Sequence, residues 1–364
     1  MWRTLGQQSS IEQFSRSIGE DTVHHAYLFV GPAHTGKSTL AVDLACALNC
    51  DADEKPCGTC HSCRRIIEGK HADIIITTPG TPVDADDPNG TSEDGQPGRS
   101  IRLGHIHNLQ HISSLPPFEG KRKILIIDSA DRMTDEAANC LLKTLEEPPP
   151  YITWILLAED ENRMLGTVVS RCQRIDVRPL PAGQLEQHLT DTLKAPPEKA
   201  HLLTAISQGC TGWALSALTD ESVLAGRSAR IESIIQLIYM GYGARFDLSR
   251  ELDTQYKKDR ATTLETLDGW VTWWRDLLVT KGGCVDSIVN VDYVNDLNEQ
   301  AGRLSMEQVR ESIRKLDEAR ENLDLNVIPR LVFDSLVYSI PHISRPPSET
   351  GTPKGALQDK NVTQ

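Results

Sequence analysis

The chain has 364 residues, of which 39% are hydrophobic and 24% charged, and a formal net charge of −13 at pH 7. This length predicts two or three domains with their own cores, and the composition is that of a globular protein. The acidic excess argues against a chain that coats nucleic acid by bulk electrostatics. The sequence contains no apolar run of 18 residues, so no membrane span is predicted. Neither a secretory nor a transit pattern is readable in the first residues, so a cytoplasmic location is expected.

The first half of the chain alternates short apolar runs with helical spacing. The runs are residues 26–30, 73–77, 124–127, 153–158 and 174–177. Such alternation favours an α/β fold with a parallel sheet covered on both faces. Residues 79–100, rich in Pro, Gly, Asp, Ser and Thr, predict a mobile acidic loop. This loop is either a regulatory or partner-binding insert or, as we favour, a solvated insertion without a specific role.

The strand signals stop at residue 179. Residues 179–220 predict a small helical unit broken at Pro196, Pro197 and Gly209, and residues 221–343 predict a larger helical domain. Its tryptophans at positions 270, 273 and 274 share one helix face and are expected in a core, with base stacking as the alternative. Residues 344–364 predict a disordered tail.

Residues 31–38 read GPAHTGKS, the spacing of a phosphate-binding loop between a strand and a helix. In such a loop backbone N–H groups and the helix N-terminus hold phosphate, a lysine reaches the outer phosphates and a serine ligates Mg²⁺. A relic loop that no longer binds nucleotide is the alternative. The residues expected to bind ATP with Mg²⁺ are Gly31, Gly36, Lys37, Ser38 and Thr39.

Hydrolysis depends on the segment KILIIDSAD at residues 123–131. Asp128 ends an apolar strand and is expected to assist the metal ion. Ser129 follows where many ATPases carry a glutamate, and its hydroxyl is a poor base at neutral pH. Asp131 is a less favoured substitute because it is expected on the next turn. We therefore expect slow or absent turnover and a nucleotide that is structural if it is bound.

Four cysteines, Cys50, Cys57, Cys60 and Cys63, follow a spacing typical of a closed zinc site. Free thiols are the alternative, and His61 is interpreted as a bystander. The remaining cysteines lack partner spacing and are expected to be small buried residues.

A helix with an apolar face is predicted over residues 135–147, just before three prolines. Its charged residues Lys143, Glu146 and Glu147 are interpreted as solvated. Arg171 stands before the fifth apolar run. By spacing alone it either completes the active site of a neighbouring subunit or forms a surface ion pair.

The segments GPAHTGKS, the cysteine knuckle, KILIIDSADRMT, AANCLLKTLEEPP and SRC together resemble the bacterial clamp-loader family of AAA+ proteins. LDLNVIPRLVFDSL also resembles the closing helix of that family. The resemblance implies an AAA+ nucleotide-binding domain at 1–178 with a zinc module at 50–63, a helical lid at 179–220 and an all-helical collar at 221–343. It further implies that Arg171 is an arginine finger and that the four cysteines hold Zn²⁺.

The resemblance also implies a hetero-pentamer with gamma/tau and delta subunits of DNA polymerase III, which loads a sliding clamp onto primed DNA. The gamma/tau motor of that family carries an Asp-Glu pair, a polar sensor after the fourth strand and a lid arginine. This chain has Ser129, then Glu159 with Asp160, then Trp213 at those places. These departures favour a subunit that supplies Arg171 to a motor over the motor itself, which remains the alternative.

Two further classes of function are disfavoured. A small-metabolite kinase has no evident use for the helical half and the cysteine knuckle. A free-standing zinc module that binds nucleic acid conflicts with the net charge of −13.

Overall fold

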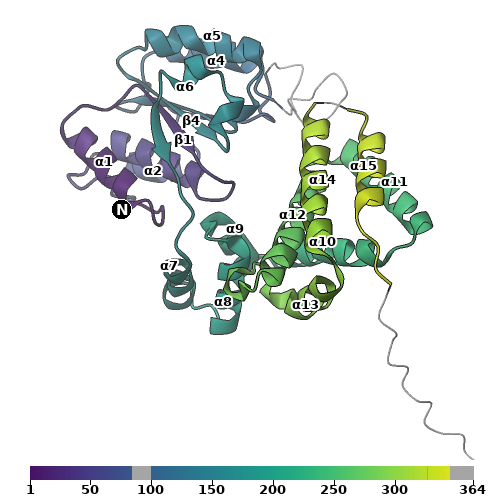
Figure 1. Ribbon diagram of the computed structural model, residues 1–364. Helices are drawn as coiled ribbons and strands as arrows, with labels where there is room; N and C mark the ends of the chain where they lie inside the picture. Colours follow the sequence, from purple (N-terminus) through teal and green to yellow (C-terminus); the bar gives the residue numbers. More distant parts are fainter. Residues whose placement is uncertain (84–99, 326, 345–364) are drawn as a thin grey trace, which may run out of the picture. The chain divides into compact units, whose positions relative to one another are not determined.

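The computed structural model describes residues 1–83, 100–325 and 327–344 (Figure 1). The chain forms two compact units, Met1–Thr219 and Asp220–Gln364. Most of the predicted acidic loop and nearly all of the predicted tail lie outside the described residues. Over the part of the chain that is described, no helix is both long and apolar enough to cross a membrane.

A five-stranded parallel sheet in the order β2-β3-β4-β1-β5 organises the first unit. The expected apolar runs are confirmed as strands to within one residue at each end, the usual uncertainty of such boundaries. The strands are β1 (Ala26–Val30), β2 (Ile74–Thr77), β3 (Lys123–Ile127), β4 (Ile152–Ala158) and β5 (Gln173–Asp176).

Helices cover both faces of this sheet, which explains why its central strands are buried and apolar except at Lys123 and Thr153 (Figure 1). Tyr27 and Phe29 of β1 pack into one core, whereas Leu28 and Val30 pack into the other. The first core is covered by α1 (Gln8–Gly19), α2 (Lys37–Asn49) and α3 (His61–Ile67). The second is covered by α4 (Leu103–Ser114), α5 (Asp135–Glu146) and α6 (Gly166–Val169), with the 3-10 turns η1 (Ala130–Arg132) and η2 (Glu161–Arg163) at the strand ends.

Short helices follow β5 in the same unit: α7 (Ala182–Gln187), the π-helical turn η3 (His188–Thr192), α8 (Pro197–Ser207) and α9 (Thr211–Thr219). The expected break at Pro196 and Pro197 is confirmed, because the helix of residues 182–192 ends before them, Pro196 is the N-cap of α8 and Pro197 lies in its first turn, where a missing N–H has no intrahelical partner to lose. Gly209, with a φ of 83°, does separate α8 from α9.

The second unit is helical over its described residues. Its elements are α10 (Glu221–Tyr239), α11 (Tyr242–Lys258), α12 (Arg260–Lys281), η4 (Val285–Ser287), η5 (Val291–Tyr293), α13 (Val294–Arg303), α14 (Met306–Asp324) and α15 (Pro329–Ser339). Trp270, Trp273 and Trp274 of α12 are fully buried in its core. Their burial confirms the core interpretation and excludes base stacking.

A buried arginine joins the ends of two helices in this unit. Arg245 is 2% exposed, and its guanidinium donates to backbone carbonyls at the ends of α10 and α15. Burial lowers the pKa of Arg245 below its ordinary value. The carbonyl oxygens compensate the charge that the core would otherwise leave unsolvated.

A buried aspartate shapes the loop before β3 in the first unit. The carboxylate of Asp73 is 1% exposed and accepts from the backbone N–H groups of Phe118, Glu119 and Gly120 at 2.7, 2.8 and 2.7 Å. Burial alone would raise the pKa of Asp73, but these donors outweigh it and leave the pKa below the usual range. The charged carboxylate therefore stabilises the folded loop.

We expect Asp73→Asn to destabilise the first unit by about 1–3 kcal/mol at pH 7, because backbone donors lose a charged acceptor. The folded-state pKa of Asp73 lies below its unfolded value, so its contribution is complete above about pH 3.8 and is lost as the pH falls further. Calorimetric unfolding at pH 7 and pH 3 measures this difference, with the exposed Asp53→Asn as control. An equal loss at both pH values would contradict the expectation.

Candidate functional site

The expected phosphate loop connects the carboxyl end of β1 to α2. Gly36 has a φ of 93° immediately before the helix, a conformation that side chains other than glycine disfavour. Gly31 passes so close to β5 that an added Cβ would lie 2.0 Å from the carbonyl oxygen of Val177. The local backbone therefore explains why glycine occupies both positions of the motif.

The loop lysine is held against the loop itself. The Nζ of Lys37 donates to the carbonyl oxygens of Gly31 at 2.6 Å and Pro32 at 2.8 Å, and the residue is 9% exposed. Burial lowers the pKa of Lys37, while the carboxylates of Glu159, Asp128 and Asp131 oppose that change. A bound phosphate would therefore compete with the two loop carbonyls for the Nζ of Lys37.

The residues expected to hold Mg²⁺ come together at the carboxyl edge of the sheet. Asp128 follows β3, and its carboxylate accepts from the hydroxyl of Ser38 at 3.4 Å. Thr39 lies beside Ser38 in the first turn of α2, and both residues are exposed.

The residue after Asp128 departs from an ordinary backbone. Ser129 has a φ of 61°, in the left-handed region, and η1 with Asp131 follows it directly. A serine in this position has no carboxylate with which to polarise a water molecule. Asp131 lies on that next turn, as the sequence predicts.

The first turn of α9 contacts the phosphate loop. The backbone N–H of Gly212 donates to the carbonyl oxygen of His34 at 2.8 Å, and an added Cβ on Gly212 would lie 2.9 Å from the same oxygen. Trp213 is the next residue of α9. Helix α9 therefore makes a close contact with the loop.

Arg171 lies between α6 and β5 with its guanidinium held on two sides. Its Nη2 pairs with Oε1 of Glu146 at 2.5 Å, and its Nη1 donates to the carbonyl oxygen of Thr167 at 3.0 Å. Glu146 is exposed, as interpreted from the sequence, and it also forms a surface ion pair with Arg171, which was one of the two alternatives for that arginine. No signal in the spacing indicates the pair, because Glu146 ends α5 and is 25 residues away. The two side chains line a hollow of about 540 Å³ beside His24 and His25.

The strand register places Arg171 at the amino ends of the parallel strands and the phosphate loop at their carboxyl ends. Gln173 pairs with Tyr27 and Asp176 pairs with Val30. Arg171 therefore precedes the amino end of β5, whereas the loop begins after the carboxyl end of β1. At about 3.3 Å per residue, these levels are at least about 13 Å apart. Arg171 is too far away to contact a phosphate held by the loop of its own chain.

The four cysteines of the predicted zinc site converge between α2 and α3. Their Sγ atoms lie within 4.8 Å of one another. Backbone N–H groups point at three of the sulfurs, including that of Cys60 toward Cys57 at 3.2 Å. Such donors from Cys60 and Thr59 lower the pKa of Cys57 to about 5. Four sulfurs around zinc, with Zn–S bonds of about 2.3 Å, are roughly 3.8 Å apart, so this donor set fits a tetrahedral thiolate site.

The other cysteines are not uniformly buried as predicted. Cys46 is buried, three are partly buried and Cys284 is exposed, so the expectation is wrong for Cys284. His61 is exposed at the start of α3 and contributes no ligand to the cluster.

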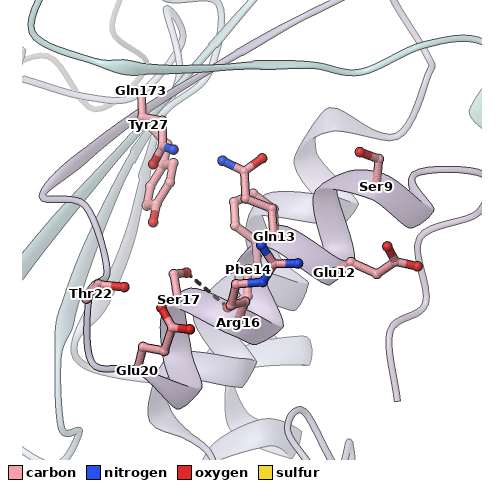
Figure 2. Close-up of a pocket in the computed structure, with 10 residues that line it drawn as sticks. All are labelled: Ser9, Glu12, Gln13, Phe14, Arg16, Ser17, Glu20, Thr22, Tyr27 and Gln173. Atoms are coloured by element: carbon pink, nitrogen blue, oxygen red, sulfur yellow. Dashed lines mark hydrogen bonds between the residues drawn. The ribbon is translucent and has the colours of Figure 1, made fainter.

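A second hollow, of about 390 Å³, lies beside α1 (Figure 2). Its lining is polar, with Glu12, Arg16 and Tyr27 among the side chains drawn there. None of the site residues predicted from the sequence lines this hollow.

Comparisons with known proteins show that the chain is similar to subunits of DNA polymerase III. The family described as "DNA polymerase III, delta subunit" matches residues 6–181. The delta' subunit of DNA polymerase III from Bacillus subtilis is 29% identical over 342 residues, which cover 93% of this chain and 98% of that protein. The tau subunit from Escherichia coli is 29% identical over 229 residues, which cover 61% of this chain and 33% of tau.

Among solved structures, a DNA polymerase III gamma subunit-related protein from Thermotoga maritima is 18% identical with a TM-score of 0.45. The aligned region covers 90% of this chain and 97% of the Thermotoga maritima chain. The relationship therefore depends on the sequence matches.

These matches relate the chain to the clamp-loader class of AAA+ proteins and confirm the resemblance seen in its motifs. Within that class it resembles the delta' subunit of bacterial DNA polymerase III over nearly its whole length, and it is also related to gamma/tau.

We expect Gly31→Ala to destabilise the first unit by about 1–3 kcal/mol, because the new methyl group would overlap the carbonyl of Val177 and push β5 from β1. Calorimetric unfolding without nucleotide measures the effect. Gly19→Ala is the matched control, since its Cβ would meet no atom within 4 Å. Equal transition temperatures for the two variants would contradict the described approach of β5 to the loop.

Proposed function

We propose that this chain is a non-motor subunit of the DNA polymerase III clamp loader and that Arg171 acts in trans on ATP held by an adjacent motor subunit. The observation that carries the proposal is the separation of Arg171 from the phosphate loop of its own chain across the length of the sheet. A guanidinium near a solvent-open hollow at that edge suits a phosphate supplied by another subunit.

The proposed assembly is a hetero-pentamer with gamma/tau and delta subunits. Residues 221–343 act as its collar, and residues 179–220 act as a lid on the nucleotide-binding domain 1–178. ATP bound by the motor subunits opens the sliding clamp, and hydrolysis triggered by primed DNA lets it close. The similarity to delta' over nearly the whole chain supports this assignment.

The chain's own phosphate loop binds ATP with Mg²⁺ weakly, or in a structural role, and turns it over slowly. Lys37 is engaged by loop carbonyls and faces the carboxylates of Glu159 and Asp131, which repel phosphate. Ser129 supplies no general base beside Asp128.

The alternative is a gamma/tau-type motor that hydrolyses ATP itself. The intact glycine–lysine–serine spacing of the loop favours it. Ser129 and Trp213 count against it, since neither provides the carboxylate or the cation that the motor pattern has at those places.

The cysteine cluster at 50–63 is proposed to hold one structural Zn²⁺. Cys50, Cys57, Cys60 and Cys63 would be its ligands, and the ion would stabilise the junction of α2 and α3. Four protein ligands leave no open coordination position for catalysis.

We expect Arg171→Ala to lower DNA-stimulated ATP hydrolysis by a reconstituted loader. At the one site that this chain completes, the rate should fall by about 10³-fold or more, because no cation neutralises the developing phosphate charge. Steady-state hydrolysis measures the loss, with gel filtration to verify assembly. Arg178→Ala, which removes a far more exposed arginine near β5, is the control. An unchanged rate for Arg171→Ala in an assembled loader would refute the finger.

Purified protein should contain about one zinc per chain, measured by elemental analysis. Cys63→Ser should lower that content and destabilise the first unit, because a buried thiolate ligand is lost. Cys284→Ser, an exposed cysteine outside the cluster, should change neither quantity. Metal-free wild-type protein of unchanged stability would disprove the site.

A further inference from the structure

The ion pair between Glu146 and Arg171 joins two elements with constrained ends. Glu146 is the last residue of α5, and prolines 148–150 follow it closely. Arg171 follows α6, and its own backbone N–H donates to the carbonyl oxygen of Val168 at 3.1 Å. Both side chains therefore begin from restricted backbone positions, which limits where the carboxylate and the guanidinium can meet.

Hydrogen bonds restrain the guanidinium of Arg171 but do not engage all of its N–H donors. One oxygen of Glu146 engages Nη2, and the Thr167 carbonyl engages Nη1. A guanidinium has five N–H donors in a rigid plane, and Nη1 also donates to the hydroxyl of Ser170 at 3.5 Å, so Nε and the second hydrogen of Nη2 are left for another acceptor. The side chain of Arg171 is 35% exposed and lines the hollow of about 540 Å³.

We propose that Glu146 is a positioning residue that orients the guanidinium of Arg171 toward a phosphate supplied by the adjacent subunit. This inference rests on the proposed function. An unrestrained arginine samples many rotamers and must lose that freedom when it meets the transition state. Glu146 and the Thr167 carbonyl impose part of that ordering beforehand, so the arginine acts in the transition state at a smaller entropic cost.

The helix α5 offers a matched pair of variants. Glu146→Gln removes the charge but keeps the length and one acceptor oxygen, and Glu146→Ala removes both. Glu147→Gln changes the next residue, which is exposed and forms no ion pair with Arg171.

The first readout uses the isolated chain. Nitrogen-15 relaxation of the Arg171 side chain, assigned by comparison with Arg171→Lys, reports how ordered the guanidinium is. We expect greater mobility in both Glu146 variants and no change in Glu147→Gln. Unchanged mobility in Glu146→Ala would overturn the restraint itself.

The second readout is DNA-stimulated hydrolysis by the assembled loader, with kcat and KM for ATP measured separately. We expect Glu146→Gln to lower kcat by about two- to fivefold at the completed site, the range of an exposed ion pair, with KM unchanged. Glu146→Ala should lower kcat at least as much, and Glu147→Gln should match the wild type.

The outcomes separate this inference from the function on which it rests. If Arg171→Ala lowers the rate while both Glu146 variants leave kcat unchanged, the positioning role alone fails. A rise in kcat would also overturn it, because Glu146 would then compete with phosphate for the arginine. If Arg171→Ala leaves the rate unchanged, the proposed function fails together with the inference.

Discussion

The parallel register of β1 with its two neighbours is the constraint on which the other features of the first unit depend. With β4 and β5 running in the same direction as β1, every strand ends at one edge and begins at the other. Asp128, Glu159 and the phosphate loop follow the carboxyl ends of β3, β4 and β1, so they meet at one edge. Arg171 precedes the amino end of β5 and is kept at the other. A chain with this topology can present an arginine to a neighbour while its own loop faces a different direction.

The carboxyl edge of the sheet combines the backbone of a phosphate loop with neighbouring acidic groups. The glycines create the backbone path that a phosphate loop needs, and Lys37 is present. Yet Lys37 is hydrogen-bonded to carbonyl oxygens of the loop, and burial lowers its pKa while the carboxylates of Glu159, Asp128 and Asp131 oppose that change.

Buried polar groups hold the irregular segments in both units. Asp73 collects three backbone donors from the loop before β3. In the helical unit, the fully buried Asp276 accepts from the backbone N–H of Asn290 at 2.7 Å and from its side chain at 2.8 Å. Arg245 does the reverse by donating to carbonyls. Each group would be costly if left unpaired, so each specifies one conformation of the segment that it contacts.

Features that depend on residues close together in the chain could be predicted from local sequence patterns. Short apolar runs predicted the strands of the sheet, because a strand buried on both faces has few polar positions. Glycine spacing predicted the phosphate loop, cysteine spacing predicted the cluster between α2 and α3, and helical periodicity placed Trp270 in a core. Features that depend on residues far apart in the chain became apparent only in the folded structure. The pairing of Glu146 with Arg171, the exposure of Cys284, the role of Asp73 and the distance between Arg171 and the loop follow from packing and strand register. No local pattern encodes them, because each is a contact or separation between segments that the fold alone brings together or keeps apart.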